Sequence, residues 1–190
     1  MRILAGTSGG PPLAAEPPPP EGARIVPEFT VDESRSVPTA VVRADDIAMD
    51  DLTGLFDKAF SVLFPALGAA GISPAGAAFA LYPRFSEDWS RCDIEVGVPL
   101  DSPLPGTVPA PLSDGSAIEI EPSEVPAGRV ASALSEGGYD GLGQAWRELT
   151  DALVAAGHTP TMPCWEVYLT EPTPDADPAD MRTGLNTRVE

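Results

Sequence analysis

The sequence predicts an α+β fold made of two repeated halves about a pseudo-two-fold axis, each half with antiparallel strands and one long helix. Three observations predict it. Apolar residues recur every three or four positions over 50–71 and 140–157, which is the pattern of an amphipathic helix. Segments typical of strands lie before and after each helix. A shift of 86 residues, as from Ala59 to Ala145, aligns the second helix and its following strand with the first.

The N-terminal segment is expected to lie outside this fold. Residues 1–27 carry seven prolines and four glycines and show no apolar periodicity, which is typical of a disordered, Pro-rich arm. The globular domain then spans residues 28–190. Its halves are residues 28–100 and 117–190, and the linker between them, 101–116, is rich in Pro, Gly and Ser.

In the first half, strands are expected at 27–33 and 37–45 before the helix, and at 77–83 and 92–100 after it. Asp50 or Asp51 is expected to cap the helix, and Gly71 to take the left-handed position after its end. Pro65 lacks a backbone N–H, so it is expected to kink the helix near Ser61 or to split it.

The second half repeats this order. Strands are expected at 116–122 and 125–134, then the helix at 140–157, then strands at 163–172 and 181–190. The 86-residue shift also pairs Gly71 with Gly157 and Tyr82 with Tyr168. The two halves are therefore expected to share one plan, with a ligand groove at the centre.

Charge and composition exclude several classes of function. With 11 Lys plus Arg against 29 Asp plus Glu the formal net charge is −18, so nucleic acid is not an expected partner. His158 is the sole histidine, and Cys92 and Cys164 stand far apart without a CxxC pair, so neither a metal nor another cofactor is expected. Both cysteines are expected to be buried free thiols.

The chain also shows no segment expected to enter a membrane. Residues 59–83 carry no charge, but five Pro and Gly residues interrupt them. The N-terminus lacks the apolar run of a secretory signal. We therefore expect a cytoplasmic protein.

Strand alternation predicts which side chains line a groove. In 164–169, Trp165 and Val167 are expected to face the helices, so Glu166 and Tyr168 face away from them. The same reasoning places Tyr82 and Glu95 on the uncovered face, with Tyr139 as a possible wall. Carboxylates and phenols among small residues suit an organic cation or a flat polar aromatic molecule, although a merely solvated face has the same pattern.

Several stretches together resemble a GyrI-like small-molecule-binding domain, the effector-binding module of AraC-type and multidrug-sensing MerR-type activators. They are FTVDE, LGAAGISPAG with AFALYPRF, DIEVGVPL, VPAGRVASAL, GGYDGLGQAWREL, CWEVYLTEP and MRTGLNTRVE, over about residues 28–190. The resemblance implies a duplicated strand-helix-strand-strand fold, a groove between the halves, and a Glu that meets cationic drugs. By its place in WEVYLTEP that residue is Glu166.

The sequence departs from the family pattern at Pro83, Ser135, Gly138 and Gly184. The short segment before residue 28 also leaves no room for a DNA-binding domain, so a stand-alone member is expected. The residues expected to bind the ligand are Tyr82, Glu95, Tyr139, Trp165, Glu166 and Tyr168.

Three functions follow from the resemblance. The first is sensing or sequestration of a small, cationic or polycyclic aromatic molecule. The second is hydrolysis of cyclopropane-bearing DNA-alkylating natural products, with Glu166 as general base and Tyr168 polarising the electrophile. The third is an interaction like that of a gyrase inhibitor. The oligomeric state does not follow from the sequence.

Overall fold

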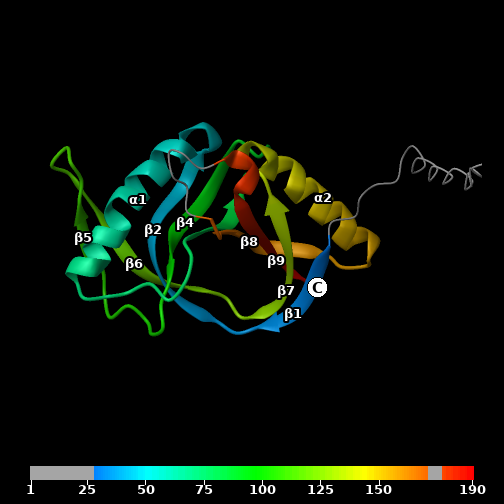
Figure 1. Ribbon diagram of the computed structural model, residues 1–190, viewed down its shortest axis with the longest axis horizontal. Helices are drawn as coiled ribbons and strands as arrows, with labels where there is room; N and C mark the ends of the chain where they lie inside the picture. The colour runs from blue at the N-terminus through cyan, green and yellow to red at the C-terminus, as the bar shows by residue number, and fades with distance from the viewer. Residues whose placement is uncertain (1–27, 171–176) are drawn as a thin grey trace, which may run out of the picture.

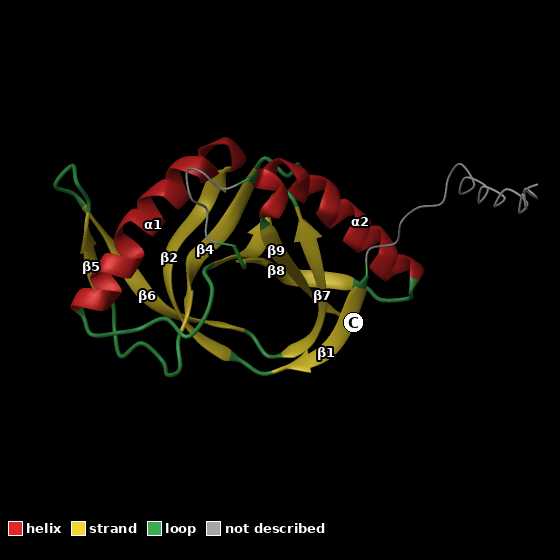
Figure 2. Ribbon diagram, viewed as in Figure 1, coloured by secondary structure: helices red, strands yellow, loops and turns green. Residues whose placement is uncertain are grey.

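The fold consists of one curled antiparallel sheet with helices on one side. The computed structural model describes residues 28–170 and 177–190, and the arm predicted at 1–27 lies outside them. The described residues form a nine-stranded sheet and two long helices, and both helices cover the same face (Figures 1 and 2). The predicted α+β class is therefore confirmed.

The strands are β1 (Phe29–Ser34), β2 (Val37–Ala48), β3 (Phe79–Phe85), β4 (Arg91–Pro99), β5 (Val108–Pro111), β6 (Ala117–Val125), β7 (Gly128–Glu136), β8 (Pro160–Tyr168) and β9 (Arg182–Val189). The long helices are α1 (Leu52–Ala69) and α2 (Leu142–Ala155), and short 3-10 turns are η1 (Met49–Asp51), η2 (Tyr139–Gly141) and η3 (Pro178–Asp180). β5 lies inside the segment predicted as a linker, where it extends the sheet beside β6.

The strand order explains why the sheet curls. It runs β1-β7-β9-β8-β3-β4-β2-β6-β5, so β1 pairs with a strand of the second half and β6 with a strand of the first. Five strands lie between β1 and β2, yet only Arg35 and Ser36 connect them. Pro126 and Ala127 make the same short connection between β6 and β7. Because two residues cannot span five strands of a flat sheet, the sheet bends until these strand ends meet across its uncovered face.

Both long helices end in the same way. Gly71 has φ 73° and Gly157 has φ 86°, the left-handed conformation predicted for them. The backbone N–H of Ile72 donates to the Leu67 carbonyl and that of His158 to the Leu153 carbonyl, each at 2.9 Å. These hydrogen bonds make a Schellman motif at each end.

The N-terminal ends and Pro65 differ from the prediction. Neither Asp50 nor Asp51 makes a side-chain capping hydrogen bond, because the η1 turn places them ahead of the helix proper. α1 continues through Pro65 without splitting, and Pro65 lies on its exposed side.

The helices pack through apolar stripes. α1 buries Ala59, Val62, Leu63 and Leu67 against the sheet, and α2 buries Leu149, Ala152 and Leu153. The segment Met49–Ala69 has the length and mean hydropathy, 1.2, of a membrane span. Its buried residues pack on β2, β4 and β5, and 22% of the most apolar window is buried within the fold.

Candidate functional site

Glu166 lies near the centre of the sheet, on β8. Its strand neighbour is Ala80 of β3, whose side chain is a single methyl group. Both side chains face the helices, and Glu166 is only 7% exposed. The strand register therefore places a carboxylate under the helices, beside one of the smallest side chains of the sheet.

Two neutral donors hold this carboxylate. The indole N–H of Trp146, from α2, donates to Glu166 Oε1 at 2.8 Å. The hydroxyl of Tyr168 donates to Glu166 Oε2 at 3.0 Å. No lysine, arginine or histidine among the described residues forms an ion pair with it. Each carboxylate oxygen thus accepts a hydrogen bond, but the negative charge has no partner.

Aromatic rings gather around Tyr168, the hydrogen-bond partner of Glu166. The Tyr168 ring makes edge contacts with Phe56 at 6.1 Å and Phe60 at 6.4 Å, both on α1. Tyr139, in the η2 turn before α2 and 41% exposed, contacts the same ring at 5.7 Å. We call this group the aromatic cage; its members are Phe56, Phe60, Tyr82, Tyr139, Trp146 and Tyr168.

Burial raises the pKa of the titratable groups in and beside the cage. It raises the pKa of Glu166 above its usual value, and the hydrogen bonds from Trp146 and Tyr168 only partly oppose this. Burial, together with the Glu166 charge, also raises the pKa of Tyr82, Tyr139 and Tyr168. The same two causes raise the pKa of the Cys164 thiol to about 12. Near neutral pH these phenols and this thiol stay protonated, so Glu166 is the group among them that can carry a negative charge.

An aromatic stack leads from the cage to the surface. Tyr82 stacks on Phe85 at 5.2 Å, and Phe85 contacts Trp89 at 4.8 Å. Trp89 is 64% exposed and has φ 59°, held in a turn whose Asp88 carboxylate accepts hydrogen bonds from Ser86 and Ser90.

The predicted facing of β3 and β8 was wrong. Tyr82, Glu166 and Tyr168 face the helices, while Phe79, Leu81, Trp165 and Val167 form a cluster on the uncovered face. Both faces of these central strands are apolar, because the curl of the sheet buries the uncovered face too. The largest ring, Trp165, therefore does not mark the helix side.

Glu95 alone of the predicted carboxylates and phenols faces away from the helices. Its neighbours in register are Leu81 and Arg43. Arg43 Nη2 lies 2.6 Å from Glu95 Oε1, and the Ser123 hydroxyl donates to Oε2 at 2.8 Å. The six predicted ligand-binding residues are thus divided: Tyr82, Tyr139, Glu166 and Tyr168 are together, whereas Glu95 and Trp165 are on the opposite face.

The sequence reasoning missed three members of the cage, namely Phe56, Phe60 and Trp146. Phe56 and Trp146 belong to the apolar stripes of the two helices, and Phe60 lies on the same helix as Phe56. The sequence feature that could have indicated them is the presence of aromatic residues on helices whose other apolar residues are mostly aliphatic. No cluster of three or more His, Cys, Asp or Glu side chains suited to a metal ion occurs in residues 28–170 and 177–190.

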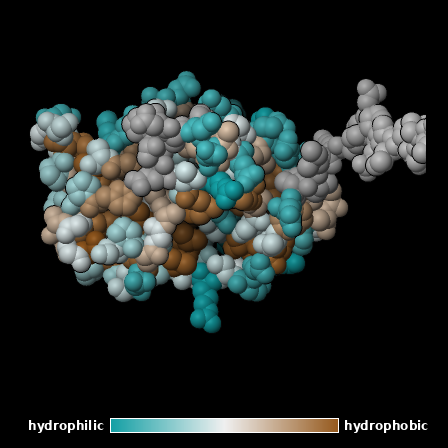
Figure 3. Space-filling view, viewed as in Figure 1, coloured by the Kyte–Doolittle hydropathy of each residue, from teal (hydrophilic) through white to brown (hydrophobic). Residues whose placement is uncertain are grey.

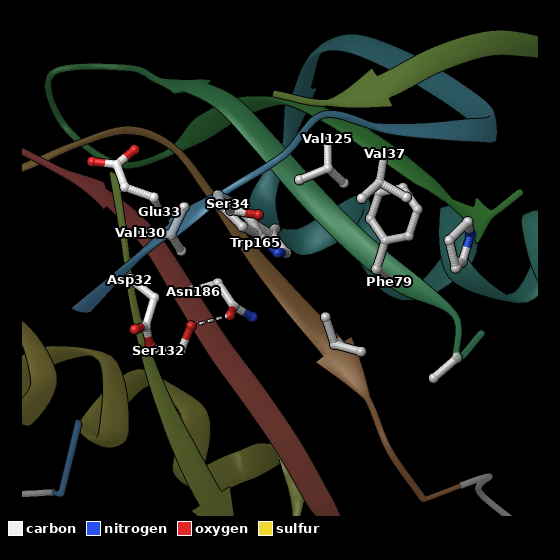
Figure 4. A pocket seen from close by; sticks show the side chains of 13 residues that line it. Asp32, Glu33, Ser34, Val37, Phe79, Val125, Val130, Ser132, Trp165 and Asn186 are labelled. Carbon is white, nitrogen blue, oxygen red and sulfur yellow. Dashed lines mark hydrogen bonds between the residues drawn. The ribbon is translucent and has the colours of Figure 1, made fainter. Parts of the chain in front are cut away.

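The uncovered face contains a cavity of about 400 Å³ (Figure 4). Its lining comes from eight strands and the segment before β3: Asp32, Glu33, Ser34, Val37, Ala77, Phe79, Pro99, Val125, Val130, Ser132, Trp165, Val167 and Asn186. In the space-filling view, hydrophobic side chains gather below the helices, over the curled part of the sheet (Figure 3).

Similar folds occur among solved structures. The C-terminal domain of EcmrR has a TM-score of 0.68 at 16% identity, covering 87% of this chain and 99% of that domain. In the EcmrR–DNA complex the match covers 60% of the EcmrR chain. SAV2435 bound to tetraphenylphosphonium has a TM-score of 0.57 at 11% identity, covering 86% of this chain and 94% of that one. A hydrolase from Listeria innocua has a TM-score of 0.54 at 9% identity, covering 87% and 94%.

At these identities the likeness shows the fold. No protein with a curated description matches the sequence. The model of the GyrI-like small molecule binding domain matches residues 53–184, which include both long helices and Glu166. The chain therefore belongs to the family of GyrI-like small molecule binding domains.

Proposed function

We propose that this domain binds an organic cation at Glu166, inside the aromatic cage. The observation that carries the proposal is a carboxylate, 7% exposed, held by neutral donors alone. A buried charge without a partner is unfavourable, and a cation that reaches it restores the missing Coulomb attraction. The faces of Trp, Tyr and Phe rings attract the same cation.

The exposed side of the aromatic cage indicates the side from which a ligand would reach Glu166. Tyr139 is 41% exposed and touches Tyr168, whereas Glu166 behind it is buried. A ligand would pass Tyr139 before it meets the carboxylate. The tetraphenylphosphonium complex of SAV2435, which shares the fold, supports a lipophilic cation as the ligand class.

Calorimetric titration with tetraphenylphosphonium tests this. Glu166→Gln keeps the shape of the side chain and removes its charge, so we expect at least a tenfold weaker affinity, about 1.4 kcal/mol. The matched control is Glu95→Gln, equally buried on the other face, which should leave the affinity unchanged. Neutral triphenylphosphine oxide should bind wild type and Glu166→Gln alike. Equal tetraphenylphosphonium affinities for wild type and Glu166→Gln would overturn the proposal.

A second candidate function is hydrolysis. Burial raises the pKa of Glu166 toward the range of an effective general base, and the Tyr168 hydroxyl, 3.0 Å away, is placed to polarise a substrate carbonyl. The fold of the Listeria innocua hydrolase is similar. A turnover assay with a cyclopropane-bearing alkylating compound separates the two functions: a hydrolase loses turnover in Glu166→Gln with little loss of substrate binding.

We also infer that the two halves arose by duplication about a pseudo-two-fold axis. Ala80 pairs directly with Glu166, the residue 86 positions later, and Leu81 pairs with Trp165 as Phe79 does with Val167. This is the register that a two-fold axis between Ala80 and Glu166 requires. The matching helix ends support it. In a crystal structure, a superposition of the halves that pairs Ala80 with a residue other than Glu166 would contradict the duplication.

A further inference from the structure

The cavity on the uncovered face follows from the topology of the sheet. The short connections Ser34–Val37 and Val125–Gly128 both cross this face, and Ser34, Val37 and Val125 line the cavity. The crossings hold the curled sheet nearly closed, so the space beneath them is part of the fold. A volume of about 400 Å³ lies within the usual range for small-molecule sites, about 300–1,000 Å³.

The inner surface of the cavity is aromatic and aliphatic. Phe79 and Trp165 lie side by side in its lining with Val167 of the same two strands, and Val37, Val125 and Val130 line it from β2, β6 and β7 (Figure 4). Ser132 and Asn186 add one polar patch, where the Ser132 hydroxyl donates to Asn186 Oδ1 at 2.8 Å. A flat apolar ring with one polar substituent matches this surface.

The charged lining residues are both acidic. Asp32 and Glu33 lie at the rim, and neither forms an ion pair with another residue that the structure describes. Arg129 lies opposite Glu33 in register, so Asp32, opposite Val130, is the acidic lining residue without a basic residue opposite it. Arg188 lies beside Val130 on the other side. Its guanidinium lies against Gly128, where an added Cβ would be 3.3 Å from it, and Arg188 does not line the cavity. The rim therefore favours a positively charged substituent over a negative one.

This cavity is separate from the cage around Glu166. Trp165 and Glu166 are consecutive on β8 and point to opposite faces of the sheet. The two sites share the strand but no lining residue.

We propose that this cavity is a second ligand site, which takes a compact planar aromatic ammonium compound independently of Glu166. The aromatic ring lies on Trp165 and Phe79, and the ammonium group lies toward Asp32. The proposal goes beyond the cage and does not depend on it.

The three tryptophans allow a direct test, because each reports a different place. Trp146 lies in the cage, Trp165 in the cavity lining and Trp89 at the surface. In protein labelled with 5-fluorotryptophan, each gives its own ¹⁹F resonance, assigned through Trp→Phe variants. We expect 2-naphthylmethylammonium to shift the Trp165 resonance saturably, both in wild type and in Glu166→Gln. Tetraphenylphosphonium should shift mainly that of Trp146.

A variant that fills the cavity tests the location. Ser132→Phe projects a ring into the cavity and should weaken naphthylmethylammonium at least tenfold. The matched control is Leu134→Phe, on the same strand and face but outside the lining, which should have no effect. Thermal unfolding checks that both variants fold. If Ser132→Phe does not fold, the ¹⁹F titration of Glu166→Gln with 2-naphthylmethylammonium, followed at Trp165, tests the proposal by itself.

The charge at the rim is tested separately. Asp32→Asn should weaken the ammonium compound about two- to fivefold, the range expected for an exposed carboxylate, and leave neutral 2-naphthylmethanol unchanged. Asp57→Asn, on exposed α1 surface, serves as the control. Two results would overturn the proposal: no saturable shift at Trp165, or a shift that disappears in Glu166→Gln, which would mean that the compound binds only in the cage.

Discussion

Two glutamates, Glu166 and Glu95, are buried to the same degree in one sheet, and they differ in their partners. Each is 7% exposed. Glu95, on the uncovered face, is paired with Arg43 and accepts a hydrogen bond from Ser123. Glu166, on the helix-covered face, meets only the neutral donors Trp146 and Tyr168. Burial alone therefore does not separate these two residues; the binding role proposed for Glu166 rests on the missing counter-charge.

The largest expected change tests the packing around Glu95. Gly97 lies two residues after Glu95 on β4. A Cβ added at Gly97 would lie 2.2 Å from the Ala40 carbonyl oxygen. Gly97→Ala should therefore lower the free energy of unfolding by about 1 to 3 kcal/mol or more, measured by urea titration. Gly184→Ala, where the nearest atom is 3.7 Å away, should be nearly neutral. Equal stabilities for the two variants would mean that the sheet around Glu95 is looser than described.

The second prediction compares removal of each charge. Glu95→Gln breaks the ion pair with Arg43, which is 40% exposed, so solvent compensates in part and the loss should be about 1 kcal/mol. Glu166→Gln removes a charge with no partner, so its stability should equal or exceed that of wild type. Urea unfolding without ligand measures both. A larger loss in Glu166→Gln than in Glu95→Gln would reverse the assignment of roles.

The third prediction is a pH dependence. Burial raises the pKa of Glu166 in the folded state above its ordinary value of 4.5, so the folded protein holds this proton more tightly than the unfolded chain. The stability that this group contributes is complete below 4.5 and is lost as the pH rises through the raised pKa.

The difference in unfolding free energy between wild type and Glu166→Gln should therefore fall as the pH rises from 4.5 toward neutral. A difference that stays constant over this range would show that Glu166 is not desolvated in solution.

The smallest expected effect concerns nucleic acid. The attraction of Glu166 for cations is local, but the net charge of −18 repels phosphate over the whole chain. We expect no salt-dependent shift of duplex DNA at micromolar protein in a gel assay at physiological salt. A shift that weakens with added salt would require a basic surface that the sequence does not show.

The helices and strands could be predicted because their signals are local. The 3.6-residue periodicity predicted both long helices, and Gly71 and Gly157 predicted their ends. The exchange of β1 and β6 between the halves could not be predicted, because pairing partners depend on contacts distant in sequence. The curl, and with it the cavity, follows from that exchange.

The sequence predicted most residues of the candidate site but not the face of the sheet on which they lie. Glu166, Tyr82, Tyr139 and Tyr168 were all named, and they do lie together. Alternation gives two faces but does not say which one the helices cover when both are apolar.

The exchanged strands also bear on how the molecule holds together. Since β1 completes the second half and β6 completes the first, neither half has a finished sheet of its own. Cutting the chain between Asp101 and Gly106, before β5, would leave two fragments joined by three strand pairings, β1 with β7, β2 with β6 and β3 with β8. The two halves thus behave as one cooperative unit, and a ligand bound on either face of β8 stabilises the whole domain.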